Sequence, residues 1–374
     1  MASGSRDAQA SLARGRTIAR ALTGSWCPEP SPPTLTHETL AAVVPLLIEA
    51  GTAGLACRRL RLSVPDGTGL PRTLRDAARL EAAVTLQGDV ALRRAVAALD
   101  TAGIAPLLAK GWAVGSLYPS PALRPYGDLD LYIPPAQLEA ARRALLSLKL
   151  PIAVDLQPHP IELDDRPYAQ LVARGILRPV GGLAVRVLGP EDHLRLLCLH
   201  LLRHEGIRPL WLCDVAAALE ALPPTFDWDY LLRGRRRRAR WVLCVLGLAH
   251  TLLGAALYAP AHLRPYLEPP LWVERAMLRR WGHGMRIFPH RTLLAYLRDP
   301  HGLGEAVRDR LPGPIAAAIH WGGDPDPRPR YRHQILDILW MGYWFGRLHL
   351  QPMSRDRRVS LSDARFERMR RLTI

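Results

Sequence analysis

Two aspartates two residues apart, Asp128 and Asp130, stand in the segment GDLDLY that spans residues 127–132. On a β-strand alternate side chains project from the same face, so both carboxylates are expected to point the same way. Neighbouring carboxylates repel each other unless a cation lies between them, and hard oxygen ligands at this spacing suit Mg²⁺. Asp155, in the later apolar segment VDL, is a candidate third carboxylate. Three carboxylates with two metal ions would stabilise the attacking and leaving oxygens of a phosphoryl or nucleotidyl transfer.

A second chemical feature precedes the aspartates. Lys110 and Gly111 follow the apolar run IAPLLA, which predicts a strand that leads through a glycine turn into a helix. Free N–H groups at a helix start attract phosphate, Gly111 permits close backbone approach, and Lys110 adds a positive charge. Gly127 would let the chain enter the next strand tightly. Only two of the 50 basic residues are lysines, Lys110 and Lys149, which makes Lys110 unusual in this arginine-rich chain.

Predicted secondary structure gives these residues a small α/β unit with helices on either side. Strands are expected at 104–109, 129–133, 152–156 and 184–188, with a helix over 135–148. Helical periodicity covers 38–50 and 74–102 before the strands. After Gly189 the chain is predicted helical at 190–204, 209–221, 227–257, 271–280, 291–298, 331–349 and 361–371. The predicted organisation is a flexible N-terminal arm (1–36), a helical region (37–103), a core (104–188) and a C-terminal helical region (189–374).

Charge is concentrated in the last part of the chain. The net charge of the 374 residues is +16, and residues 231–374 alone carry 26 basic and 11 acidic side chains. Such a segment suits an acidic partner, such as nucleic acid or an anionic membrane, or it is a solvated arginine-rich surface. The run Arg235–Arg238 is interpreted as a solvated helix face, with an acidic substrate as the alternative.

The compartment is predicted from cysteines and hydropathy. Five widely spaced cysteines form no C-x-x-C pair, which favours reduced thiols in a cytoplasmic protein over a zinc site or disulfides. The N-terminus lacks the apolar region of a secretory signal. The apolar segment 241–259 contains His250 and two glycines, so a buried helix is favoured over a membrane span.

The string K-G-x(12)-R-x-x-G-D-x-D, which runs from Lys110 to Asp130, with the VDL segment at Asp155, resembles an uncharacterised nucleotidyltransferase family of the DNA polymerase β superfamily. The resemblance continues through the segments VLGPEDHLRLLCLHLLRH (187–204) and WLCDV (211–215), and covers about 40–250. It implies an α/β (α+β) nucleotidyltransferase core with a short mixed sheet and flanking helices.

The resemblance also implies roles for residues. Asp128, Asp130 and Asp155 would hold two Mg²⁺ ions against the triphosphate of an NTP, and Asp155 would assist deprotonation of the acceptor hydroxyl. Nucleotide binding would involve Lys110, Gly111, Arg124 and Gly127. Arg124 would either bind the triphosphate or pair with a carboxylate. This chain departs from the superfamily at Gly111-Trp112, where many members have Gly-Ser or Gly-Gly, and after Asp155, where Leu-His-Trp is common.

Three histidines on one predicted helical face form a further group: His193, His200 and His204. In the family pattern the last two recur together with Asp214 on the next helix. A structural His–Asp hydrogen-bond network is favoured, with a wall of the active site or a metal site as alternatives.

The predicted function is Mg²⁺-dependent transfer of an NMP, expected to be AMP, from an NTP to a hydroxyl-type acceptor on a small molecule, peptide or protein. One alternative is a catalytically weak NTP-binding module, which Gly111-Trp112 supports. Another is an RNA-modifying enzyme that grips RNA with its basic C-terminal region, although no RNA-binding signature is present. Nucleic acid is therefore a less favoured partner, and no stable membrane span is expected.

Overall fold

The computed structural model describes residues 2–33, 35–61, 70–284, 313–328 and 331–350. Its strands are β1 (Leu107–Ala109), β2 (Asp128–Tyr132), β3 (Ala153–Gln157), β4 (Ile176–Val180) and β5 (Leu183–Val187). The helices before and within the sheet are α1 (Ala2–Leu22), α2 (His37–Ala41), α3 (Val44–Glu49), α4 (Ala53–Leu60), α5 (Arg72–Thr101), α6 (Gly111–Gly115), η1 (Pro121–Leu123), η2 (Pro135–Gln137), α7 (Leu138–Leu146), η3 (Ile161–Leu163) and α8 (Tyr168–Arg174). Those after it are α9 (Pro190–Arg203), α10 (Pro209–Glu220), α11 (Trp228–Leu232), α12 (Arg236–Leu253), η4 (Ala261–Tyr266), α13 (Leu271–His283), α15 (Pro314–His320) and α16 (Tyr331–Leu350).

The five strands form one mixed sheet in the order β3-β2-β1-β5-β4. Strand β2 runs parallel to β3 and antiparallel to β1, β1 runs parallel to β5, and β5 forms a hairpin with β4. The mixed sheet with flanking helices confirms the predicted α+β core. The sequence analysis missed β4, whose residues ILRPV are mostly exposed and include Pro179. Proline removes a backbone donor and is tolerated on an edge strand, so β4 lacks the apolar alternation of an ordinary strand.

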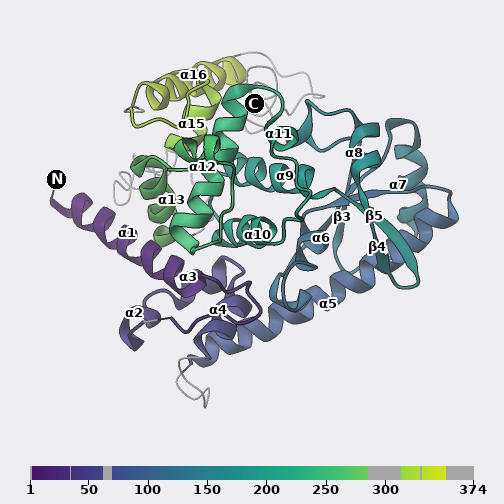
Figure 1. Cartoon of the computed structure of the whole chain (residues 1–374), viewed down its shortest axis with the longest axis horizontal. Coiled ribbons are helices and arrows are strands. Elements are labelled where there is room, and N and C mark those ends of the chain that lie inside the picture. Colours follow the sequence, from purple (N-terminus) through teal and green to yellow (C-terminus); the bar gives the residue numbers. More distant parts are fainter. Residues whose placement is uncertain (1, 34, 62–69, 285–312, 329–330, 351–374) are drawn as a thin grey trace.

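The two faces of the sheet are covered by different helices (Figure 1). Alternate β2 residues Leu129, Leu131 and Ile133 pack against α5 and α7, as part of a buried cluster that also contains Leu92 and Val187. The intervening positions of β2 face the other way, where Tyr132 packs with residues of η3, α8 and α9. Asp128 and Asp130 share this second face because side chains alternate along a strand. The sheet therefore presents its carboxylates toward the C-terminal helices.

The N-terminal arm is a correction to the sequence analysis. Residues 1–36 were expected to be flexible, but α1 lies against α13 and its last turns, including Ile18 and Leu22, are buried in the largest core cluster. The two helices approach closely where Gly15 of α1 meets Leu278 and Gly282 of α13 meets Ser11, and a Cβ at either glycine would lie within 2 Å of a backbone oxygen. Small residues at a helix crossing let the two backbones come together, and such pairing is not visible in the periodicity of one helix.

Helix α12 accounts for the apolar segment that the sequence analysis weighed as a membrane span. Its side chains from Trp241 to Ala249 are buried in the same core as α9 and α10. Within the described ranges, no helix combines the length and the apolar character needed to cross a bilayer. The segment is therefore a core helix, as favoured from the sequence.

Other boundaries differ in detail. The helix expected at 38–50 is two short helices, α2 and α3, because Pro45 begins a new helix after a break at Ala42–Val43. The segment expected at 227–257 divides into α11 and α12, with Gly234 at φ +109° between them. Helix α15 was not predicted. The helices expected at 291–298 and 361–371 lie outside the described residues.

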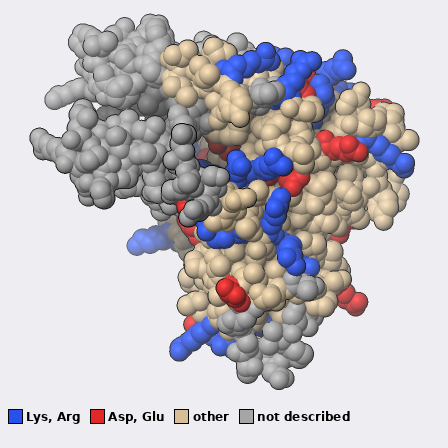
Figure 2. Space-filling view, turned by 90° about the vertical axis from the view of Figure 1, so that its left-hand side faces the viewer, with Lys and Arg blue, Asp and Glu red and all other residues tan. Residues whose placement is uncertain are grey.

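The arginine run that begins α12, Arg235–Arg238, is only partly a solvated face. Arg235 and Arg236 are exposed, but Arg238 is 3% exposed and pairs with Asp164 and Asp165. Farther along, Arg240 Nη1 lies 2.8 Å from Asp324 Oδ2. Figure 2 shows one face of the molecule, on which the basic side chains lie in separate groups divided by uncharged surface.

Candidate functional site

The three predicted carboxylates lie on adjacent strands. Asp128 and Asp130 are on β2, and in the parallel pairing of β2 with β3 the register partner of Asp130 is Asp155. Asp128 and Asp155 are exposed, whereas Asp130 is 7% exposed. The Asp155 carboxylate accepts a hydrogen bond from Gln157 Nε2, two residues along the same strand. The fold thus brings together, on one sheet face, residues that are 27 positions apart in the sequence.

Lys110 lies against this group. Its Nζ is 2.6 Å from Asp130 Oδ1, and both side chains are largely buried, at 14% and 8% exposure. Burial raises the pKa of Asp130, and the opposing effect of Lys110 and, more weakly, of His200 does not fully offset it. The ammonium group therefore acts as the counter-ion of a carboxylate that has lost much of its hydration.

The backbone at this lysine is unusual. Lys110 has φ +53° and Gly111 has φ +25°, so two successive residues adopt positive φ at the end of β1. For a residue with a side chain this conformation costs on the order of 1–3 kcal/mol and persists only where surrounding contacts enforce it. One such contact is the Lys110 N–H, which donates to His193 Nε2 at 3.3 Å. Burial lowers the pKa of His193 to about 4, so its neutral ring supplies the acceptor nitrogen at neutral pH.

The glycines of the predicted nucleotide site differ in their surroundings. Gly111 opens α6, a helix of five residues, and a Cβ there would lie 3.4 Å from the Tyr126 side chain. Nothing lies within 4 Å of a Cβ at Gly127, which precedes β2 directly. Because α6 is so short, Lys110 is the principal source of positive charge at this turn.

Arg124 pairs with a carboxylate. Its Nη2 lies 2.6 Å from Asp214 Oδ2 and its Nε donates to the same carboxylate, which also accepts a 2.8 Å hydrogen bond from the Tyr118 hydroxyl. The Asp214 side chain is fully buried and that of Arg124 is 7% exposed. The carboxylate-pairing alternative from the sequence analysis is therefore the one observed, and the pair links the chain before β2 to α10.

The histidines on α9 have different partners from those expected. His200 Nδ1 lies 3.2 Å from Glu162 Oε1, so its partner is a glutamate of η3, whereas Asp214 bonds Arg124 and Tyr118. The rings of His200 and His204 are 4.6 Å apart, and both pack against Trp211 of α10. The favoured His–Asp hydrogen-bond network was thus wrong in its partner.

Glu162 was missed by the sequence analysis. It lies in the loop segment PIELDD, where a single acidic residue among several has no periodicity or motif to mark it. Its side chain is 4% exposed, and Arg203 Nη1 lies 3.3 Å from the same Oε1 that contacts His200. Burial alone would raise the pKa of Glu162, but the His200 hydrogen bond and the charges of Lys110, His200 and Arg203 lower it to about 2.

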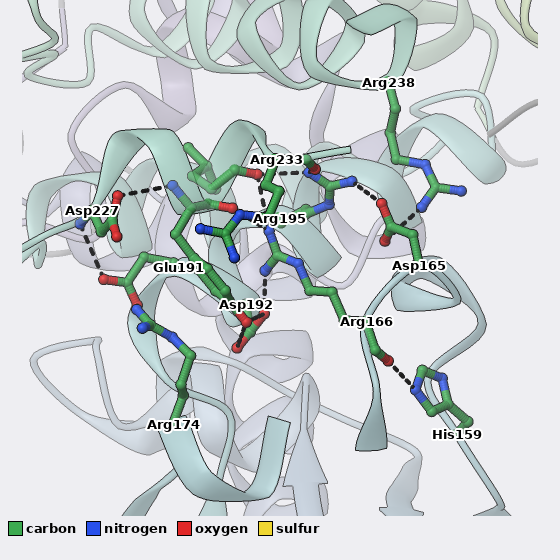
Figure 3. A network of polar contacts seen from close by, with 12 residues as sticks. His159, Asp165, Arg166, Arg174, Glu191, Asp192, Arg195, Asp227, Arg233 and Arg238 are labelled. Carbon is green, nitrogen blue, oxygen red and sulfur yellow. Dashed lines mark hydrogen bonds and ion pairs between the residues drawn. The ribbon is translucent and has the colours of Figure 1, made fainter. Parts of the chain in front are cut away.

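The loop that carries Glu162 is fixed by a second polar network (Figure 3). Arg166, just beyond η3, pairs with the fully buried Asp192 of α9, and its main-chain carbonyl lies 2.8 Å from His159 Nε2. Arg195 of α9 pairs with Asp165 at 2.7 Å. Buried pairs are costly to break, since removing one partner leaves an uncompensated charge. The network therefore fixes residues 159–166 against α9 and α12.

The three aspartates offer the type of ligand that suits Mg²⁺. Carboxylate oxygens are the ligands that Mg²⁺ prefers, and the Lys110 ammonium shows that Asp130 is presented to a cation. Within the described ranges, no three His, Cys, Asp or Glu side chains converge closely enough to hold a metal ion. Asp128, Asp130 and Asp155 thus offer carboxylate oxygens on one sheet face, but the Asp155 carboxylate is turned toward Gln157 and the three do not converge on one point.

Comparison with known proteins identifies a family match that covers the sheet and the helices around it. A family model described as an uncharacterised nucleotidyltransferase matches residues 37–150 and 149–254. No curated protein and no solved structure matches the chain. The match spans α2 to the end of α12, which includes the whole sheet, Lys110, the three aspartates and the histidines at 193, 200 and 204. Since it covers more than half of the sequence, the chain belongs to this uncharacterised nucleotidyltransferase family.

Proposed function

We propose that the protein transfers an NMP, expected to be AMP, from an NTP to a hydroxyl group on a small molecule, peptide or protein, with release of pyrophosphate. The observation that carries this proposal is the common sheet face of Asp128, Asp130 and Asp155, with the Lys110 ammonium on Asp130. Family membership supports the nucleotidyltransferase class, and the site residues, the metal and the acceptor are part of the proposal.

In this proposal Asp128, Asp130 and Asp155 hold Mg²⁺, of which two ions are expected. Bound there, Mg²⁺ supplies positive charge to the phosphate oxygens and the leaving group. The Lys110-Gly111 turn binds the triphosphate, since its lysine brings charge and its glycine allows close backbone approach. Arg124 acts on the nucleotide indirectly, because its guanidinium is engaged by Asp214 and shapes the loop that precedes β2.

The test is a labelled-NTP assay with Mg²⁺ in host extract, followed by mass spectrometry for a nucleotidylated product. The same measurement detects nucleotidylation of the protein by itself. Asp128→Asn and Asp130→Asn are expected to lower transfer by at least 100-fold, because each removes a charged metal ligand. Asp100→Asn, at the exposed end of α5, is the matched control and should retain full activity. Normal turnover by Asp128→Asn would contradict the metal assignment, and NTP binding without any product would favour a binding module.

A further inference from the structure

Glu162 and His200 form a buried pair beside the carboxylate face. The His200 Nδ1 to Glu162 Oε1 distance is 3.2 Å, and the two side chains are 15% and 4% exposed. Glu162 comes from η3 and His200 from the middle of α9, so the pair joins the loop after β3 to the C-terminal helices.

The electrostatic environment determines which atom of the Glu162–His200 pair carries the proton. The pKa of Glu162 is lowered to about 2, since the His200 hydrogen bond and nearby cations outweigh the effect of burial, so the group is a carboxylate at neutral pH. A carboxylate only accepts hydrogen bonds, so the proton of the contact must lie on His200 Nδ1. In the neutral imidazole the other nitrogen, Nε2, then carries a lone pair and can accept a proton.

The ring is also held in place beside the sheet, since Leu196, one helical turn earlier on α9, lies in the same buried cluster as Tyr132 of β2. It packs edge-on against Trp211, with ring centroids 4.9 Å apart, and stacks at a tilt on His204. His200 lies close enough to Asp130 for the protonated form of its ring, the form that has accepted a proton, to oppose the rise in the pKa of that carboxyl. Lys110, which contacts Asp130, likewise lowers the pKa of Glu162. The pair and the carboxylate face therefore share one electrostatic environment.

A polar group between them lacks a partner. The Tyr132 hydroxyl, on the same face of β2 as Asp130, is buried and makes no hydrogen bond to the described residues. Burial raises its pKa well above the ordinary value, and the charges of Asp130 and Glu162 add to this effect. An unsatisfied buried hydroxyl costs about 1–3 kcal/mol, so a polar ligand that bonds it would recover that free energy.

We propose that His200 is the proton acceptor for the acceptor hydroxyl and that Glu162 is the positioning residue that holds its tautomer. The inference rests on the proposed function and reassigns the proton-accepting role implied for Asp155. The acceptor O–H bond breaks and its proton passes to His200 Nε2, while the oxygen forms a bond to the α-phosphorus. The bond from that phosphorus to the α–β bridging oxygen breaks, and pyrophosphate leaves with the electron pair.

Charged groups from every neighbouring element face His200. Arg203 ends α9 and His204 directly follows it, Glu162 comes from η3, Asp130 from β2 and Lys110 from the β1–α6 turn. Lys110 and Arg203 are balanced by the carboxylates of Asp130 and Glu162, so the ring is surrounded by nearly compensating charges. Trp211 of α10 adds an uncharged wall.

The first test is the pH profile of kcat/KM for transfer. His200→Gln should lose about 100-fold or more in kcat together with the acidic limb of the wild-type profile, since glutamine cannot accept the proton. Glu162→Gln should lower kcat less than His200→Gln does, because the ring keeps its proton-accepting nitrogen and loses only the carboxylate that fixes its tautomer. Arg203→Gln, which touches the same Glu162 oxygen, and the exposed His262→Gln should both keep the limb.

The second test does not depend on activity. Nitrogen-15 NMR of labelled histidine should show the Nδ1–H tautomer for His200, assigned by the signals lost in His200→Gln, and a tautomer mixture in Glu162→Gln. An Nε2–H tautomer in the wild type, or an acidic limb that persists in folded His200→Gln, would overturn the proposal. If Asp155→Asn instead removes the limb while His200→Gln keeps it, the proton acceptor is Asp155. Absence of any transfer by the wild type refutes the proposed function and this role with it, whatever the tautomer.

Discussion

Lys110 Nζ lies 2.6 Å from Asp130 Oδ1, so one of two lysines in the chain contacts the most buried of the three candidate metal ligands. The contact is made from a residue at φ +53°, which places the ammonium over the carboxylate face at a cost in backbone strain. A positive charge is thereby built into the site at the point where a triphosphate is expected to bind.

The first prediction concerns this lysine. Lys110→Met leaves Asp130 without its counter-ion in a largely buried position, so we expect a loss of roughly 3 kcal/mol in the free energy of unfolding. We also expect NTP binding to weaken at least tenfold in calorimetric titrations with Mg–ATP. Lys149→Met removes the only other lysine, which is exposed, and should change neither quantity. Unaltered ATP affinity in folded Lys110→Met would exclude a role for Lys110 in nucleotide binding.

The second prediction concerns Arg124 and Asp214. Asp214→Asn leaves the Arg124 guanidinium buried and uncompensated, and the expected loss is about 3–5 kcal/mol of unfolding free energy in urea titrations. The double variant Arg124→Met with Asp214→Leu removes both charges and should be more stable than Asp214→Asn. If the loss in the double variant equals the sum of the losses in Arg124→Met and Asp214→Leu measured singly, the pair does not interact as observed.

The third prediction is a pH dependence of stability. The pKa of Glu162 is lowered to about 2 in the folded protein, against about 4.3 in an unfolded chain. A depressed carboxyl pKa adds stability above the unfolded value, and that stability is lost as pH falls toward the folded value. Between pH 6 and pH 4 the wild type should therefore lose about 0.6 kcal/mol more than Glu162→Gln. Parallel urea titrations at the two pH values measure this difference, and equal losses would contradict it.

The fourth prediction concerns the crossing of α1 and α13. In Gly282→Ala the new Cβ would lie 1.8 Å from the Ser11 carbonyl oxygen, so the helices must separate, at an expected cost of roughly 2 kcal/mol. Gly127→Ala is the matched control, since open space surrounds a Cβ there, and its thermal midpoint should equal that of the wild type. If Gly282→Ala melts like the wild type, the close crossing is not a feature of the protein in solution.

The sequence predicted the strands of the sheet better than it predicted the contacts between side chains. Strands β1, β2, β3 and β5 were predicted because their apolar runs and bounding glycines are local signals. The shared face of Asp128 and Asp130 also follows from alternation along one strand. The register that pairs Asp130 with Asp155 depends on how two distant segments align, which no local pattern encodes.

Partners of charged side chains were the least predictable feature. Asp214 was assigned to histidines on the strength of a family pattern, whereas its partners are Arg124 and Tyr118, about 90 residues earlier. The partner of His200 is Glu162, in a loop that also contains Asp164 and Asp165. The packing of α9 against η3 determines which carboxylate contacts His200. Spacing along the chain does not distinguish between the candidate carboxylates.

The Arg124–Asp214 pair and the Arg166–Asp192 pair each join a segment of the sheet region to a later helix. A fragment that ended after β5 would expose a hydrophobic surface. The guanidinium groups of Arg124 and Arg166 would then have no counter-ions. The sheet region therefore cannot be combined with an arbitrary set of helices by recombination. A recombinant protein with a different C-terminal half would need acidic residues equivalent to Asp192 and Asp214 in that half. The sheet region and the C-terminal helices are therefore expected to be inherited together.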